Sequence, residues 1–240
     1  ISKTKDKSQF EKSKKISKEI EELEKIQKEL KNKINPILNF IPNIALDDVP
    51  IGKDEKSNKE LKNAGNVPKF NFKVKSHYEI GSNLNLMDFD TATKTSGSRF
   101  VFLKGKLAEL ERAISNFMLD IHTKEFGYQE ISPPLIATED TMFGTGQLPK
   151  FENDQFELKL DVDQKKYLIP TAEVILTNMV KDCILSHKDL PIRVVASTPC
   201  FRKEAGSYGK DTKGMIRQHQ FYKVELVSIV KPNDSSKELE

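Results

Sequence analysis

The segment that most constrains the architecture reads VVASTPCFRKE at residues 194–204 and IRQHQFYKVE at residues 216–225. The loop between these two runs contains three glycines, Gly206, Gly209 and Gly214. Two runs rich in β-branched and aromatic residues, joined by a glycine-containing loop, predict an antiparallel β-hairpin.

One face of this hairpin is predicted to be polar, because side chains on a strand alternate between its two faces. The return arm would place five residues on that face: Arg217, His219, Phe221, Lys223 and Glu225. On the first arm, Arg202 and Glu204 share a face. Arginines suit phosphates, an aromatic ring stacks on a flat base, and carboxylates accept from amines or hydroxyls. A solvated face with cross-strand ion pairs is the alternative, and the pattern leaves both open.

The hairpin resembles motif 2 of class II aminoacyl-tRNA synthetases, in the form found in seryl-tRNA synthetases. The resemblance runs from Thr198 to Ser207 and continues through residues 219–221 and 224–225. Further blocks that agree with this family are GTGQLPKF at 144–151, IPTAE at 169–173, IPN at 41–43, SGSRF at 96–100, and a stretch at 103–136 similar to motif 1. Several blocks in the order and spacing of the family make the match specific.

The resemblance implies an α+β fold: a class II antiparallel sheet flanked by helices, preceded by one long helix of an antiparallel coiled-coil arm. It implies three regions: the second helix of a tRNA-binding arm (1–40), a linker and the start of the catalytic region (41–95), and a partial catalytic domain (96–240). The implied activity is that of a serine–tRNA ligase, with ATP-dependent activation of L-serine to seryl-adenylate and transfer to tRNA(Ser).

The resemblance also implies a serine site. Its expected residues are Thr171, Ala172, Glu173, Arg202 and Glu225. Thr171 and Glu173, expected on one side of an extended loop, would take the serine ammonium, and Glu225 would accept from the serine hydroxyl. A site built to bind a hydroxyl rejects alanine, because its polar group is otherwise left unpaired.

The implied ATP site contains Arg202, Lys203, Glu204, Arg217 and Phe221. Arg202, the expected catalytic residue, would hold the α-phosphate and the serine carboxylate. Glu204 would contact the adenine, Phe221 would stack on it, and Arg217 would reach the far phosphates. Lys203 stands where the family more often has a small residue, and because it lies at the opposite strand parity from Arg202 we expect it to point away or toward tRNA. The same argument from parity places Tyr222 off the face, while Cys200 is expected to pack and His219 to act mainly as a spacer.

The N-terminal part is predicted to be a long amphipathic helix, from Ile1 to about Ile37. A heptad seam is formed by Ile16, Ile20, Leu23, Leu30, Ile34 and Ile37, with Gln27 in the missing turn. Asn35-Pro36 and Ile41-Pro42-Asn43 would end or kink it. Over residues 1–37, eleven lysines stand against seven acidic residues. Charge alone fits a solvated coiled-coil face, and the resemblance favours an arm that grips tRNA.

Weaker patterns fill the middle of the chain. Residues 47–66 are polar and turn-rich, and Phe70 and Phe72 alternate with polar residues as in a short strand. A helix from Leu103 to about Phe126 carries a broad apolar face, and the resemblance implies a homodimer interface at 103–136. Further predictions are a strand at 128–131, a helix near 172–186, and strands near 192–204 and 215–230.

Composition sets broad limits on the protein. Of 240 residues, 37% are hydrophobic and 31% charged, with net charge +3 and mean hydropathy −0.55; this indicates a core that shares the chain with a solvated part. Two cysteines, Cys183 and Cys200, cannot form a disulfide framework or a four-cysteine zinc site, which favours a reducing, cytosolic setting. No apolar run approaches the roughly 20 residues that span a bilayer.

The chain starts at Ile1, and the third motif of the family, with the main Mg²⁺ ligand, is expected downstream of Glu240. We therefore expect a fragment that is inactive alone. One alternative is a paralogue that loads an amino acid onto a carrier protein, which would be expected to lack the arm. Another is a non-catalytic coiled-coil protein, which would not explain the hairpin. Rossmann and P-loop enzymes are disfavoured, because the sequence contains neither GxGxxG nor GxxxxGK[ST].

Overall fold

The computed structural model describes residues 7–160, 164–205 and 213–240. The chain divides into two compact units, residues 1–66 and 67–240. Within the described residues, no helix is both long enough and apolar enough to span a membrane. The predicted domain limits at residues 40 and 95 stay predictions.

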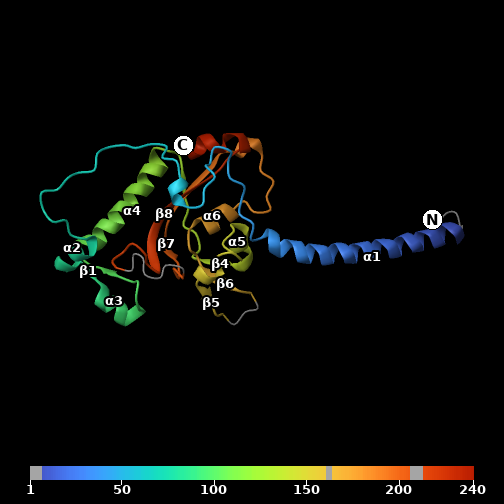
Figure 1. Ribbon diagram of the computed structural model, residues 1–240, viewed down its shortest axis with the longest axis horizontal. Helices are drawn as coiled ribbons and strands as arrows, with labels where there is room; N and C mark the ends of the chain where they lie inside the picture. The colour runs from blue at the N-terminus through green and yellow to red at the C-terminus, as the bar shows by residue number, and fades with distance from the viewer. Residues whose placement is uncertain (1–6, 161–163, 206–212) are drawn as a thin grey trace. The chain divides into compact units, whose positions relative to one another are not determined.

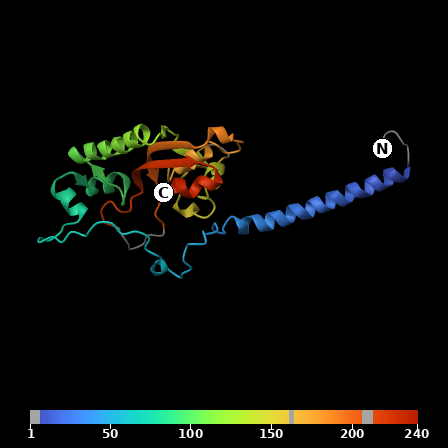
Figure 2. The same ribbon diagram turned by 90° about the horizontal axis from the view of Figure 1, so that it is seen from above.

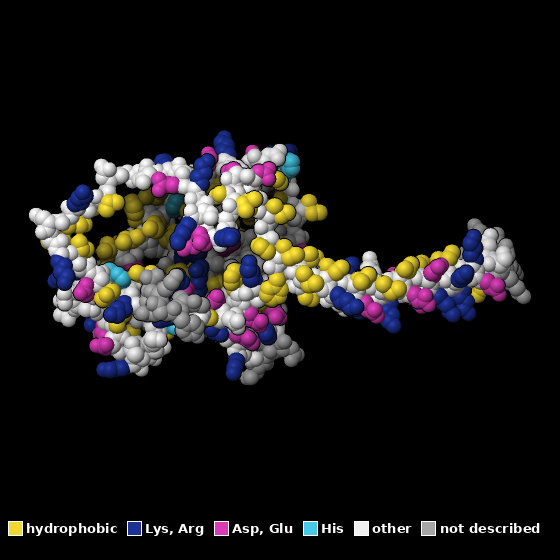
Figure 3. Space-filling model, in the orientation of Figure 1, with side chains coloured by type: hydrophobic (Ala, Val, Ile, Leu, Met, Phe, Trp, Pro, Cys, Tyr) yellow, Lys and Arg dark blue, Asp and Glu magenta, His cyan; other side chains and the backbone are white. Residues whose placement is uncertain are grey.

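The first unit is dominated by the helix α1 (Lys7–Leu38), a single rod of 32 residues (Figure 1). Pro36 lies inside its last turn, so the helix ends two residues beyond the proline and not at it. The predicted seam is exposed: Ile16 is 46% and Leu23 61% accessible, and an apolar stripe runs along the rod (Figure 3). Nothing in the described part of this unit covers that stripe. The remainder of the unit contains one turn of 3-10 helix, η1 (Glu55–Ser57).

The second unit opens with an extended stretch in which the predicted strand at Phe70 and Phe72 is absent. Their rings lie 5.1 Å apart between centroids, and both side chains are exposed. Alternation alone did not make a strand, because no segment among the described residues pairs with this one. The chain then forms α2 (His77–Asn83), β1 (Met87–Asp88), α3 (Phe89–Ser96) and β2 (Phe102–Leu103), with β1 and β2 antiparallel.

The central sheet has the strand order β3-β7-β8, formed by β3 (Gln129–Glu130), β7 (Ile192–Phe201) and β8 (Gln220–Ile229). The predicted hairpin is confirmed, since β7 and β8 pair antiparallel over ten residues each. The short β3, also predicted, joins β7 in parallel, so the sheet is mixed at that edge.

The helix α4 (Lys106–Lys124) covers one face of this hairpin (Figure 2). The hydroxyl oxygens of Ser115 on α4 and Ser197 on β7 lie 2.6 Å apart and pin the helix to the strand. Helix formation was predicted from Leu103, but Leu103 is the last residue of β2 and the helix begins at Lys106. Gly127, the predicted stop, has φ +69°, a conformation that favours glycine.

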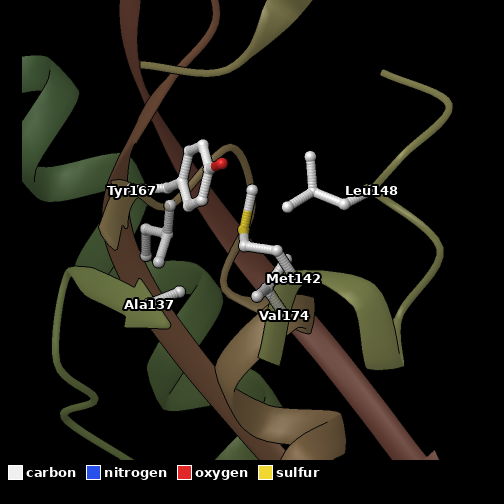
Figure 4. Packing of buried hydrophobic residues seen from close by; sticks show 6 residues of the cluster. Ala137, Met142, Leu148, Tyr167 and Val174 are labelled. Carbon is white, nitrogen blue, oxygen red and sulfur yellow. The ribbon is translucent and has the colours of Figure 1, made fainter. Parts of the chain in front are cut away.

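A second small sheet has the order β4-β6-β5, with β4 (Ile136–Thr138), β5 (Glu157–Leu158) and β6 (Lys166–Leu168) all antiparallel. It packs with α5 (Glu139–Gly144) around a buried cluster shown in Figure 4: Ala137, Met142, Leu148, Tyr167, Ile169 and Val174. Because Ile169 and Val174 belong to this cluster, it fixes both ends of the segment that carries Thr171.

The helix α6 (Glu173–Asn178) is much shorter than the predicted range of 172–186. The Asn178 amide group donates to the carbonyl of Val174 at 2.8 Å and to that of Thr141 at 3.1 Å, and thereby ties the end of α6 to α5. The remaining elements are η2 (Glu152–Asp154), η3 (His187–Asp189), η4 (Pro232–Asp234) and α7 (Ser235–Leu239).

Candidate active site

The hairpin has one face toward α4 and one toward α6. Strand register places Cys200 opposite Phe221, Thr198 opposite Lys223, and Ala196 opposite Glu225. Directly opposed residues point to the same face, so three small buried side chains on β7 leave room above them for the three large ones on β8. The predicted sharing of a face by Phe221, Lys223 and Glu225 is therefore confirmed.

Arg217 and His219 lie before the first residue of β8, so strand parity does not place them. The pairing nevertheless extends one step, because the Arg202 N–H donates to the carbonyl of His219 at 3.0 Å. The His219 ring packs between Phe100 and Phe156, with centroids 5.4 and 5.9 Å away. His219 thus joins the hairpin to neighbouring loops.

Four of the five residues predicted to bind ATP line one cleft of about 400 Å³. Its walls are formed by Arg202, Glu204, Met215, Ile216, Arg217, Gln218 and Phe221. The guanidinium carbon of Arg202 lies 5.4 Å from the centroid of the Phe221 ring. Arginine, ring and carboxylate in one cleft are the combination expected for a nucleotide.

Lys203 does not line this cleft. Its side chain is exposed, and its ammonium lies 5.8 Å from the centroid of the Phe156 ring. Tyr222 is also off the face, at 56% exposure, and Cys200 is fully buried, where burial raises the pKa of its thiol.

The entrance to the hairpin loop is held by two residues that the sequence interpretation missed. The guanidinium of Arg99 donates to the carbonyl of Glu204 at 3.1 Å. Asp154 accepts from the Ala205 N–H at 2.7 Å through its side chain and from the Lys203 N–H at 2.8 Å through its carbonyl. Arg99 belongs to the SGSRF block, which could have indicated it, whereas no sequence signal indicated Asp154.

These contacts hold Glu204 in a left-handed conformation, φ +51°. Its carboxylate accepts from the guanidinium of Arg217 at 2.9 Å. The two residues, expected at opposite ends of ATP, contact each other here. Gly206, Ser207, Gly209 and residues 210–212 of the loop lie outside the described residues.

A second polar cluster lies where α6 begins. The hydroxyl of buried Thr171 donates to Oε2 of Glu225 at 2.5 Å and accepts from the backbone N–H of Glu173 at 3.2 Å. It also accepts from Nζ of Lys223 at 2.7 Å, and the same ammonium is paired with Oε2 of Glu225. Lys223 was on the predicted face but not among the predicted site residues.

Glu173 and Ala172 take positions that the sequence interpretation did not foresee. Glu173 is the first residue of α6 and is exposed, so it does not share an extended loop with Thr171. Ala172 is fully buried against the cluster formed with Leu176, Val194 and Ala196, and its side chain packs there.

Arg202 joins the cleft to this second cluster. Its Nε donates to the carbonyl of Pro170 at 3.2 Å, and Pro170 immediately precedes Thr171. One guanidinium is therefore placed between the Phe221 ring and the Thr171–Glu225 pair. Within the described residues, no group of three or more His, Cys, Asp or Glu side chains is arranged to hold a metal ion.

The comparisons with known proteins agree with this geometry. Residues 156–240 match the family model of the tRNA synthetase class II core domain (G, H, P, S and T). The chain is 68% identical to the serine–tRNA ligase of Pelagibacter ubique over 241 residues, which cover all of this chain and 58% of that protein.

Two solved structures share the fold. The seryl-tRNA synthetase of Pyrococcus horikoshii, complexed with ATP, has a TM-score of 0.85 at 37% identity and covers 95% of this chain and 55% of its own. The cytoplasmic serine–tRNA ligase of Naegleria fowleri, in complex with AMP, has a TM-score of 0.82 at 29% identity, covering 92% and 52%.

The hairpin, its cleft and these matches define a class II aminoacyl-tRNA synthetase core, as the sequence resemblance implied. Within that class, the chain belongs to the seryl-tRNA synthetase family. It spans little more than half the length of the relatives it matches.

Proposed function

We propose that this chain provides the serine and ATP sites of a serine–tRNA ligase, which forms seryl-adenylate and transfers serine to tRNA(Ser). One observation carries the proposal: Arg202 lies between the Phe221 ring, 5.4 Å away, and the carbonyl of Pro170, which precedes the Thr171–Glu225 cluster. A residue in that position can contact an α-phosphate on one side and an amino-acid carboxylate on the other.

In the first step, a carboxylate oxygen of serine attacks the α-phosphorus of ATP. A new P–O bond forms, the bond from this phosphorus to the bridging oxygen breaks, and pyrophosphate leaves with the electron pair. The Arg202 guanidinium neutralises charge on the α-phosphate while Phe221 holds the base, so positioning and charge supply the catalysis without a protein nucleophile.

ATP would enter as its magnesium complex, which we propose as part of the substrate. No step of this scheme passes through the ion.

Selection of serine would depend on Glu225, whose side chain is 19% exposed. A carboxylate in that setting offers an acceptor to the serine hydroxyl. Alanine would leave that acceptor unpaired and desolvated, which is the strongest form of discrimination that a small site can make.

Binding of tRNA is proposed for α1, whose exposed lysines would lie along the phosphate backbone of the RNA. We also propose a homodimer formed through the region 103–136. The apolar side chains that α4 exposes support this: Leu110, Ile114, Phe117 and Met118 are 43–64% accessible. The proposed cytosolic setting is supported by two free cysteines, one exposed and one buried.

The test is serine-dependent exchange of pyrophosphate into ATP, measured with the gene product that carries this chain. Exchange with serine, and far weaker exchange with threonine or alanine, is expected. Glu225→Ala should reduce the preference for serine over alanine more than it weakens ATP binding. Folded protein without exchange would contradict the proposal and favour a non-catalytic protein, whereas exchange without charging of tRNA would favour an enzyme that loads a carrier protein.

A further inference from the structure

Lys223 contacts two residues of the proposed serine site, Thr171 and Glu225. Its Nζ lies 2.7 Å from the Thr171 hydroxyl oxygen and is paired with the Glu225 carboxylate. The Lys223 side chain is only 30% exposed, so water screens this pair less than it would a surface pair.

The hydrogen bonds fix the direction of the Thr171 hydroxyl. A hydroxyl has one hydrogen to donate and two lone pairs. The Lys223 ammonium and the Glu173 N–H are both donors, so they occupy the two lone pairs. The single hydrogen of Thr171 must therefore point to Glu225. This hydroxyl has no acceptor capacity left for the serine ammonium while Lys223 stays in place.

Both donors reach the same oxygen of Glu225. Thr171 and Lys223 each contact Oε2, and no described residue donates a hydrogen bond to Oε1. Hydrogen bonds that hold one oxygen of a carboxylate also orient the plane of the group and therefore its second oxygen. The substrate hydroxyl then meets an acceptor that is already positioned.

We propose that Lys223 is a positioning residue for serine recognition, which, together with Thr171, clamps Oε2 of Glu225 and presents Oε1 to the hydroxyl of the amino acid. This inference rests on the proposed function, because it assigns the specificity of that same site. Lys223 does not line the proposed nucleotide cleft. Its loss is therefore expected to affect serine and to spare ATP.

The experiment compares Lys223→Met, Lys223→Gln and Lys223→Arg with the unmodified gene product in pyrophosphate exchange. Methionine keeps an unbranched side chain without charge or donor, glutamine keeps a neutral donor, and arginine keeps a charged donor. Lys188→Met, at an exposed lysine of η3, is the matched control for loss of one charge. Serine, alanine and ATP are each varied, and thermal unfolding identifies any variant that does not fold.

Lys223→Met is expected to raise the KM for serine about 10–100-fold, the effect of losing a hydrogen bond to a charged group. The KM for ATP should stay within about twofold, and the ratio of kcat/KM for serine over alanine should fall by the same factor as serine binding weakens. Lys223→Arg should restore most of that ratio, with Lys223→Gln between the two.

In folded Lys223→Met, an equal loss of kcat/KM for serine and alanine, or an unchanged serine/alanine ratio, would show that Lys223 only supports the fold and would overturn the inference. Absence of serine-dependent exchange in the unmodified protein would instead reject the proposed function itself. The two failures are therefore distinguishable.

Discussion

Tyr167 offers a test of the core because its hydroxyl is buried without a partner. The side chain is 0% exposed and packs among Met142, Leu148 and Val174 (Figure 4). Its hydroxyl oxygen has no hydrogen-bond partner among the residues that the structure describes. Burial raises the pKa of this phenol, so the group stays neutral. We predict that Tyr167→Phe stabilises the protein.

The magnitude follows from two opposing effects. Relief of an unsatisfied, desolvated hydroxyl is worth about 1–3 kcal/mol. Removal of one oxygen leaves a small void that costs a few tenths of a kcal/mol at about 24 cal/mol per Å³. The free energy of unfolding should rise by about 1–2.5 kcal/mol, and the midpoint of thermal unfolding by about 2–10 °C for a unit of this size.

The assay is equilibrium unfolding of the gene product in guanidinium chloride. A shift of the midpoint at constant slope reports a change in stability alone. Tyr222→Phe is the matched control, because Tyr222 is 56% exposed and water can satisfy its hydroxyl. That control should change stability by less than about 0.5 kcal/mol.

Destabilisation by 1 kcal/mol or more in Tyr167→Phe would refute the reasoning. It would mean that the hydroxyl has a partner, such as a buried water that also serves another polar group. Gln155 Oε1 and Thr145 Oγ1 are likewise buried without a partner among the described residues.

Three further predictions concern other parts of the second unit. Arg193 lowers the pKa of Glu238 from 4.5 to about 2, so this contact stabilises the fold above pH 4.5 and is lost as the pH falls toward 2. Between pH 4.5 and 2, unfolding curves should therefore show a smaller loss of stability for Glu238→Gln than for the unmodified protein. Equal losses in the two proteins would contradict this. Gly214→Ala should displace His77, because φ at this position is +77° and a Cβ would lie 2.2 Å from the His77 ring nitrogen. The KM for ATP is expected to rise as a result, and an unchanged KM would show that the loop adapts. Met142→Ala should cost about 2–5 kcal/mol in guanidinium unfolding, and a cost below 1 kcal/mol would mean that the core collapses around the gap.

Elements with a strong local period were predicted closely. Apolar residues spaced three and four positions apart in the N-terminal region predicted α1. The alternation of side chains between two strand faces in the last third of the chain predicted the hairpin and the shared face of Phe221, Lys223 and Glu225. These predictions were correct because each pattern lies within a single helix or strand. The strand at Phe70 and Phe72 failed because a strand also needs a partner, and none lies beside it in the described part of the chain.

Lengths and directions depended on contacts between distant residues. The helix predicted to reach residue 186 ends at Asn178, whose side chain bonds carbonyls of α5 and α6. Periodicity predicted the short strand β3, but only packing decided that it runs parallel to β7.

The sequence by itself determined the family, the hairpin and the residue types of the site, because motif order and strand parity are properties of the linear chain. Only the tertiary structure decided which of those residues meet. The hydrogen bond from the Ala205 N–H to Asp154 at the entrance to the hairpin loop, and those of Thr171 with Lys223 and Glu225, join residues 51 to 54 positions apart. Hydrogen bonds over such separations depend on how the elements pack, which no local pattern of residues encodes.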